Sequence, residues 1–171
     1  MHSANQTDSV SAKTISPVSL LEQEIQEIAM FETFDLFVED IRKRVTSIGL
    51  KELRTPEEVD NAVQNTKGTL LIFVNSTCGC AGGIARPALE KALHGSAVPD
   101  HLATVFAGQD KEATEQARSY FVNEPPSSPS FALINDGKFV GIIHRKDIEG
   151  KDPEVVAEAL KRFFEAHQRR N

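Results

Sequence analysis

Cys78 and Cys80 are the only cysteines among the 171 residues of the chain, and their place in the sequence indicates chemistry. They follow the most apolar run, residues 69–75, at the point where a buried strand would lead into a helix. A thiolate at a helix N-terminus faces unpaired backbone N–H groups and the positive end of the helix dipole, which favour the ionised sulfur. The position therefore predicts a nucleophilic thiol near neutral pH.

The spacing of the two cysteines determines which thiol chemistry is expected. Cys-x-x-Cys is the usual redox signature at such a junction, whereas here only Gly79 separates the sulfurs. A disulfide across one residue closes a small ring, so strain should make it easy to reduce, and Gly79 helps by permitting unusual backbone angles. We expect a pair that accepts or exchanges disulfides. Two inert buried cysteines are the less favoured interpretation, because the Gly-rich junction has no apolar pattern.

The apolar pattern on either side predicts the elements that must position these sulfurs. Strands are expected at residues 69–75, 102–106, 130–135 and 138–143, and helices at residues 81–94, 110–121 and from 153 onward. Asp136-Gly137 makes a hairpin of the last two strands, and Asp152-Pro153 caps and opens the last helix. This order, entered through a helix, is that of a thioredoxin-like α/β fold, in which helices flank both faces of a central mixed sheet.

Pro129 is the second candidate for the site, because it begins the strand that ends in the Asp136-Gly137 turn. In thioredoxin-like folds the proline at this place follows a cis peptide bond, which lays the preceding backbone against the sulfurs, where it can pair with a substrate. We therefore predict that Ser128, a cis Pro129 and Gly79 bind the substrate. An ordinary trans proline on an edge strand is the alternative.

Other side chains near the motif carry weaker signals. Pro87 should kink the helix that follows the cysteines. Arg86 could attract an anionic substrate or stabilise a thiolate, but a solvated helix residue is the favoured interpretation. The histidines at 94, 101 and 144 lack the spacing of a zinc site, so no metal site is predicted.

An N-terminal extension precedes this fold. The polar residues 1–17 are expected to be disordered, and Leu20, Leu21, Ile25 and Ile28 then mark a short helix. A longer amphipathic helix follows over residues 31–48, closed by Gly49, and Thr55-Pro56 opens another. We divide the chain into an extension, residues 1–29, and a thioredoxin-like domain, residues 30–171.

Composition limits the classes of function. The content of 40% hydrophobic and 26% charged residues fits one globular domain with a sizeable core. A formal net charge of -6 argues against a nucleic-acid partner, which requires clustered Lys and Arg. No apolar stretch approaches the roughly 18 to 20 residues that span a bilayer, and the N-terminus does not resemble a signal peptide. We expect a cytoplasmic protein with no membrane partner.

With the junction and the hairpin in place, the sequence resembles the bacilliredoxin family, thioredoxin-like proteins with a Cys-Gly-Cys site. The resemblance covers residues from about 30 to 164 and rests on residues 74–88, 105–113, 125–130 and 148–150. It implies an oxidoreductase that removes bacillithiol, a low-molecular-weight thiol, from proteins that carry it as a mixed disulfide. Bacillithiol would be a co-substrate, with no bound cofactor, and S-bacillithiolated proteins would be the partners.

The resemblance also implies a role for each cysteine. Cys78 would be the attacking thiolate that takes the bacillithiol cap, and either Cys80 or a second bacillithiol would then clear Cys78. Two alternatives stay open. One is a general disulfide isomerase or reductase with a different partner thiol, and the other is a module that chelates a soft ion such as Cu(I) through both thiolates.

Overall fold

The computed structural model describes residues 17–168. The chain divides into two compact units with the boundary between Glu39 and Asp40, and the first helix, α1 (Pro17–Ser47), runs across it. The predicted disordered tail lies, up to residue 16, outside the described residues. The boundary expected between residues 29 and 30 falls within α1 and stays a prediction.

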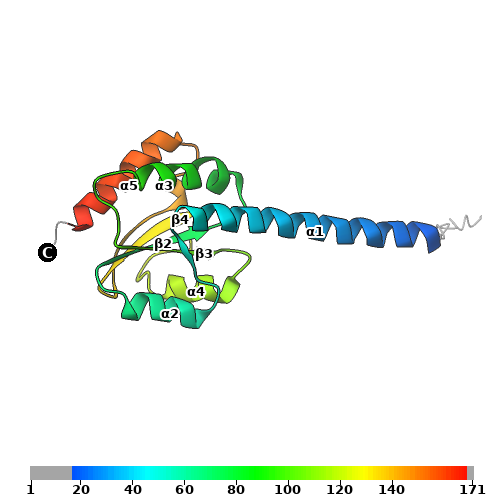
Figure 1. Ribbon diagram of the computed structural model, residues 1–171, viewed down its shortest axis with the longest axis horizontal. Helices are drawn as coiled ribbons and strands as arrows, with labels where there is room; N and C mark the ends of the chain where they lie inside the picture. Colours follow the sequence, from blue (N-terminus) through cyan, green and yellow to red (C-terminus); the bar gives the residue numbers. More distant parts are fainter. Residues whose placement is uncertain (1–16, 169–171) are drawn as a thin grey trace, which may run out of the picture. The chain divides into compact units, whose positions relative to one another are not determined.

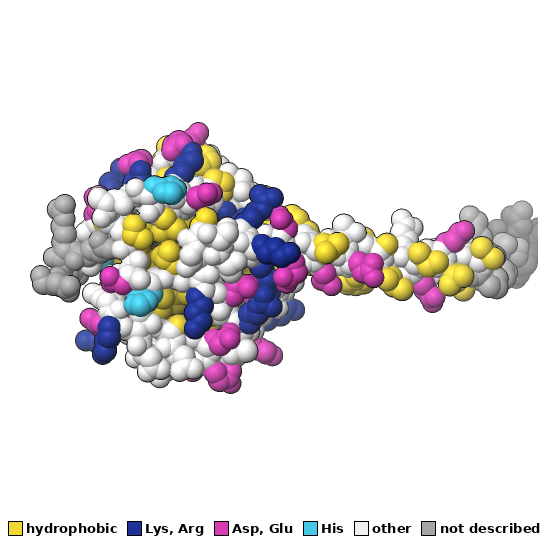
Figure 2. All heavy atoms as spheres, in the orientation of Figure 1, with side chains coloured by type: hydrophobic (Ala, Val, Ile, Leu, Met, Phe, Trp, Pro, Cys, Tyr) yellow, Lys and Arg dark blue, Asp and Glu magenta, His cyan; other side chains and the backbone are white. Residues whose placement is uncertain are grey.

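Helix α1 is one continuous helix, so the expectation of two helices was wrong. At 3.6 residues per turn, Leu21, Ile25 and Ile28 lie on one side of the helix, whereas Phe34 and Ile41 lie on nearly the opposite side. The two apolar sets predicted two helices, but no Gly or Pro interrupts the backbone of α1 after Pro17. Figure 2 shows exposed apolar and acidic side chains along this helix. No helix within residues 17–168 is long and apolar enough to cross a membrane.

A mixed sheet forms the centre of the second unit, as predicted, and it has five strands rather than the four expected (Figure 1). Its order is β1-β3-β2-β4-β5, with β1 (Lys51–Glu52), β2 (Thr69–Asn75), β3 (His101–Phe106), β4 (Ser130–Asn135) and β5 (Lys138–Ile143). Strands β1, β3 and β2 run parallel, whereas β4 is antiparallel to β2 and β5 is antiparallel to β4. Strand β1 was not predicted, because two residues are too short for an apolar pattern.

Helices cover both faces of the sheet, which confirms the predicted thioredoxin-like class (Figure 1). Helices α3 (Arg86–Ala92) and α5 (Pro153–Gln168) pack on one face, and α2 (Pro56–Asn65) and α4 (Lys111–Ser119) on the other. Alternation along β2 supplies both cores: Leu71 and Phe73 belong to the first, and Leu70, Ile72 and Val74 to the second. Strand β2, buried throughout, is therefore held from both sides and delivers the residues after Asn75 to a fixed place.

A buried ion-pair network ties the end of α1 to the sheet. Arg42, only 8% exposed, donates to Glu52 on β1 at 2.6 Å and to Asp110 before α4 at 3.0 Å. Its guanidinium also lies 5.1 Å from the centre of the Phe106 ring. The C-terminal end of α1, β1, β3 and the start of α4 thus share one anchor.

The turns and helix ends follow local sequence signals. Thr55 and Glu58 form the expected capping box at the start of α2. Asp136 and Gly137 both have positive φ, 46° and 76°, as the two-residue hairpin turn between β4 and β5 requires. Asp152 Oδ1 accepts from the Glu154 N–H at 2.8 Å and caps α5. The Asp136-Gly137 turn therefore sets β5 antiparallel beside β4.

Candidate active site

The end of β2 positions the first cysteine through hydrogen bonds to Asn75, a polar residue that is only 1% exposed. Its Oδ1 accepts from the Ser76 N–H at 2.9 Å and from Arg86 Nη1 at 3.0 Å. Arg86 Nη1 also donates to the Ser76 carbonyl at 3.0 Å. The backbone that leads to Cys78 is therefore held on both sides before the thiols begin.

Arg86 is thus not the solvated helix residue that the sequence favoured. Its side chain turns back from α3 to the strand end and is partly buried there, and burial lowers the pKa of its guanidinium. A Cβ at Gly82 would come within 2.7 Å of Arg86 Nη2, so the glycine leaves room for this side chain. Arg86 acts as a positioning residue beneath the cysteines.

Pro87 follows an irregular helix start, and the kink expected at this residue stays a prediction. Residues Ala81–Ala85 form a π-helical turn, and regular α-helix begins only at Arg86, with Pro87 in its first turn. Proline lacks the N–H that an α-helix would bond four residues back, so the wider turn is accommodated just before it.

The two thiols are free and half-buried, and they contact each other. Their Sγ atoms lie 2.7 Å apart. Cys78 Sγ also accepts from Ser76 Oγ at 3.1 Å and from the Ala81 N–H at 3.4 Å. Cys78 thus receives three donors at the start of the helix, which matches the sequence expectation of a stabilised thiolate.

These contacts move the pKa values of the two thiols in opposite directions. Burial opposes ionisation of Cys78, but hydrogen bonds from Cys80, Ser76 and Ala81 outweigh it and lower the pKa of Cys78. Burial raises the pKa of Cys80, and the adjacent Cys78 thiolate raises it further. The arrangement therefore favours a thiolate on Cys78 and a protonated thiol on Cys80.

Gly79 has an ordinary φ in this structure, where both thiols are free, so its expected role in a closed Cys78–Cys80 ring stays a prediction. Its φ lies outside the left-handed region, and a Cβ built on it would meet no atom within 4 Å. The residue is exposed between the sulfurs. The absence of a side chain at Gly79 therefore leaves open space beside the two free thiols.

The Ser128–Pro129 peptide bond is cis, as expected, and the strand register brings it beside the end of β2 that leads to the cysteines. Ser130 pairs with Val74, so the residues before β4 meet the residues after β2 at one edge of the sheet. Pro129 is buried and Ser128 half-buried. Ser130 Oγ donates to the Ser127 carbonyl at 2.9 Å, which closes the turn on itself.

Arg145 also lies in the surroundings of the thiols, although it was not among the site residues expected from the sequence. It begins a short 3-10 helix (Arg145–Asp147) after β5, and its backbone N–H donates to Ser127 Oγ at 2.8 Å. Its positive charge interacts with both Cys78 and Cys80 and lowers the pKa of each. The signal in the sequence was only a His-Arg-Lys run at 144–146, far along the chain from the cysteines.

Within residues 17–168, no cluster of three or more His, Cys, Asp or Glu side chains could hold a metal ion. The three histidines named above are not brought to the thiols by any described contact; His144 pairs with Glu124 instead, at 2.8 Å. The two thiols alone remain the reactive groups of this site.

Comparison with protein families and curated proteins gives relatives over most of the chain. The family described as Disulphide isomerase matches residues 34–168. A bacilliredoxin of Geobacillus kaustophilus is 55% identical over 137 residues, which cover 80% of this chain and 94% of that protein. A bacilliredoxin of Staphylococcus haemolyticus is 53% identical over 138 residues, covering 78% and 94% respectively.

Solved structures that match this chain include thioredoxins. Mitochondrial thioredoxin 3 of Saccharomyces cerevisiae in its oxidised form matches with a TM-score of 0.50 and 22% identity, over 72% of this chain and 98% of that one. A thioredoxin of Malassezia sympodialis matches with a TM-score of 0.50 and 17% identity, over 70% and 91%. These two likenesses confirm the thioredoxin fold.

Proposed function

Because the chain belongs to the bacilliredoxin family and is a thiol–disulfide oxidoreductase, we propose that it removes bacillithiol from proteins that carry this thiol as a mixed disulfide. The observation that carries the proposal is the difference between the two thiols in hydrogen bonding and in pKa. Cys78 receives hydrogen bonds from Ser76, Ala81 and Cys80, which favour its thiolate, whereas Cys80 keeps its proton. One sulfur is thus prepared to attack and the other to follow.

In the first step the Cys78 thiolate attacks the bacillithiol sulfur of the capped protein. A Cys78–bacillithiol disulfide forms, the bond between bacillithiol and the client cysteine breaks, and the client leaves as a thiolate that takes a proton from water. One disulfide is exchanged for another, so no outside oxidant or reductant is consumed. The rate depends on the fraction of Cys78 that is ionised, which its lowered pKa increases.

In the second step Cys78 must be cleared. Cys80, with its sulfur next to Cys78, can lose its proton and attack Cys78, which closes a Cys78–Cys80 disulfide and releases bacillithiol. A second bacillithiol can instead attack the bound cap, which regenerates the Cys78 thiolate and leaves with the cap as a bacillithiol disulfide. Ring strain across one intervening residue favours this second route.

Client docking is assigned to the turn before β4. Ser128 and Pro129 would lie against the extended backbone of the client, and Gly79 would leave room for it beside the sulfurs. Bacillithiol enters as a co-substrate and no bound cofactor is required. The cytoplasm is the proposed compartment, because bacillithiol exchange needs cysteines that are kept reduced.

The test is to mix the reduced protein with a client capped by bacillithiol and to measure the freed client thiol over time. We expect release by the wild-type protein and none by Cys78→Ser. If the wild-type protein leaves the client capped but rearranges the disulfides of a scrambled protein, the general isomerase is the correct function. If it does neither and binds Cu(I) through both thiols, the chelating module is correct.

A further inference from the structure

Beside the thiols lies a cationic segment to which the exchange chemistry assigns no role. His144, Arg145 and Lys146 follow β5, and the Arg145 backbone is bonded to Ser127 in the turn that carries the cis bond. The charge of Arg145 reaches both sulfurs. The segment therefore borders the place where the capped cysteine of a client must arrive.

The Arg145 guanidinium is oriented by the Glu149 carboxylate, which engages only some of its N–H donors. Its Nη2 and Nε donate to Glu149 at 2.7 and 3.2 Å, and the two side chains are 45% and 55% exposed. A guanidinium has five N–H donors, so these two bonds leave others for a second planar anion. Glu149 fixes the orientation of the side chain and competes with any incoming carboxylate.

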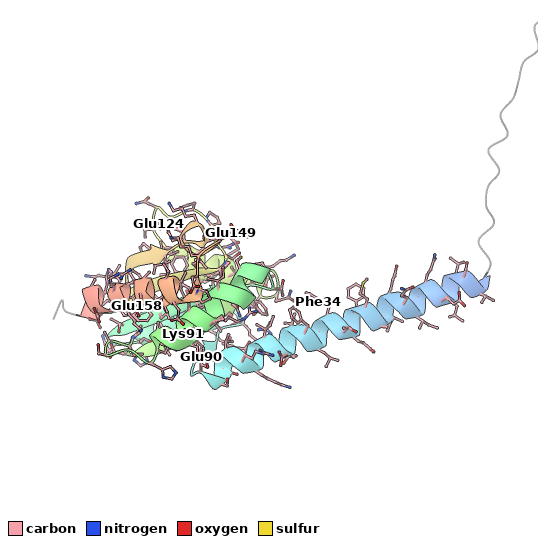
Figure 3. All side chains as sticks on the ribbon, turned by 90° about the horizontal axis from the view of Figure 1, so that it is seen from above. Phe34, Glu90, Lys91, Glu124, Glu149 and Glu158 are labelled. Atoms are coloured by element: carbon pink, nitrogen blue, oxygen red, sulfur yellow. The ribbon has the colours of Figure 1, made fainter. Side chains whose placement is uncertain are left out.

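A cavity of about 250 Å³ is lined by His144 and Lys146, the two neighbours of Arg145 in the chain, but not by Arg145 itself. Pro125, Pro126 and Ser127 also line this cavity. Glu124, which also lines it, is engaged by His144 at 2.8 Å, whereas Lys146 forms no ion pair within residues 17–168. Figure 3 labels Glu124 and Glu149, the partners of His144 and Arg145, and the two labels stand near each other in that view.

We propose that Arg145 and Lys146 form a carboxylate-binding subsite, which takes the acidic tail of a low-molecular-weight thiol cap while its sulfur meets Cys78. The proposal rests on the proposed function insofar as a cap is transferred to Cys78. The subsite would determine which sulfur of the mixed disulfide Cys78 attacks. With the tail of the cap held beside the thiols, Cys78 attacks the sulfur of the cap, and the client sulfur becomes the leaving group.

The test uses one client peptide capped either with glutathione, which carries carboxylates, or with glutathione diethyl ester, in which they are masked. The freed peptide thiol gives kcat/KM for wild type and for Arg145→Gln, Lys146→Gln and Glu149→Gln. Lys67→Gln serves as the matched control, because Lys67 is exposed just before β2, at the opposite end of that strand from the cysteines.

In Arg145→Gln we expect kcat/KM for the glutathione cap to fall about tenfold, as the loss of a charged hydrogen bond predicts, and that for the ester cap to change much less. Lys146→Gln should act in the same direction but more weakly. Glu149→Gln should lower KM for the glutathione cap, because the competing carboxylate is gone. Lys67→Gln should leave both substrates unaffected.

An equal loss for both caps in Arg145→Gln would overturn the proposal, since the arginine would then act only on the sulfurs. So would a variant that loses neither activity, or a wild-type protein that frees neither peptide. The outcome is separate from that of the proposed function. Preference for the glutathione cap over its ester can persist even if bacillithiol is not removed, and bacillithiol can be removed without any such preference.

Discussion

Ser76 Oγ donates to Cys78 Sγ at 3.1 Å, a bond that no hydroxyl makes to Cys80 within the described part of the chain. The buried Asn75 fixes the Ser76 backbone, so the hydroxyl is held at the sulfur before any substrate binds. The order of the two cysteines in the reaction therefore originates at the end of β2, one turn before the helix itself begins.

Replacing Ser76 by alanine should shift the pH dependence of Cys78. The bond to a charged sulfur contributes about 1.5 kcal/mol in favour of the thiolate, so its loss should raise the pKa of Cys78. Because the thiolate appears as pH rises through this pKa, both ionisation and cap transfer should begin at higher pH in the variant. Ultraviolet absorbance of the thiolate, measured against pH in a Cys80→Ser background, gives the shift.

Thr77→Ala is the control for this prediction. Thr77 is the adjacent hydroxyl residue and, among the described contacts, makes no hydrogen bond to either sulfur. Removal of the Thr77 hydroxyl should leave the pH at which Cys78 ionises unchanged. Equal shifts in the two variants would show that the Ser76 bond is not the cause.

Arg86 should stabilise the folded protein much more than an exposed arginine does. In Arg86→Gln the Asn75 and Ser76 oxygens lose a partly buried charged donor, and the free energy of unfolding should fall by about 1 to 3 kcal/mol. The Arg44 side chain is 73% exposed and pairs with Asp40, so Arg44→Gln should lower the free energy of unfolding by about 0.5 kcal/mol or less. Urea unfolding measures both. Similar losses in the two variants would contradict the positioning role.

The contact between Arg42 and Glu52 should make the free energy of unfolding depend on pH in the acidic range. Burial opposes ionisation of Glu52, but hydrogen bonds from Arg42 and Arg54 outweigh it, so the folded-state pKa lies below the ordinary value. The contribution of Glu52 is then complete above its unfolded-state pKa of about 4.3 and is lost as pH falls through the folded-state pKa.

We therefore expect Glu52→Gln to be less stable than wild type by about 1 to 3 kcal/mol at neutral pH. The difference should shrink as the pH of the urea titration is lowered below about 4. Glu115→Gln, which removes a pair whose carboxylate is 72% exposed, is the control and should change little at any pH. A difference for Glu52→Gln that does not vary with pH would be inconsistent with an ionised partner of Arg42.

Gly79 and Gly137 should respond differently to alanine. Gly79 has ordinary φ and open space around it, so Gly79→Ala should change the free energy of unfolding by about 0.5 kcal/mol or less. Gly137 has φ +76° and would place a Cβ 3.3 Å from the Val63 carbonyl, so Gly137→Ala should cost about 1 to 2 kcal/mol. Thermal or urea unfolding compares them. A large loss at Gly79 would contradict the ordinary φ and the open space described for this residue.

Much of the fold could be predicted because the signals are local. Strands β2, β4 and β5 occupy the residues expected from apolar runs and from the Asp136-Gly137 turn. Strand β1 carries no such signal, since its two residues are charged and are placed only by pairing with β3. The interruption expected within α1 failed because a change of apolar face does not break a helix unless the backbone is also weakened.

The residues of the site also divide into those that have a local sequence signal and those that have none. The cysteines and Pro129 could be found because they sit at the ends of predictable strands, and the register of β4 on β2 brings them together. Arg86 and Arg145 could not be assigned, because their partners are a strand end and a distant turn. A long flexible side chain gives no sign in the sequence of which way it will turn.

The central claim, that Cys78 takes the cap, is tested most directly by intact-mass and peptide mapping of the Cys80→Ser variant after mixing with a bacillithiol-capped client. We predict one bacillithiol adduct on Cys78, with an equal amount of freed client. Loss of cap transfer in this variant, together with an adduct on Cys80 in the reciprocal Cys78→Ser variant, would contradict the assignment and reverse the roles of the two cysteines.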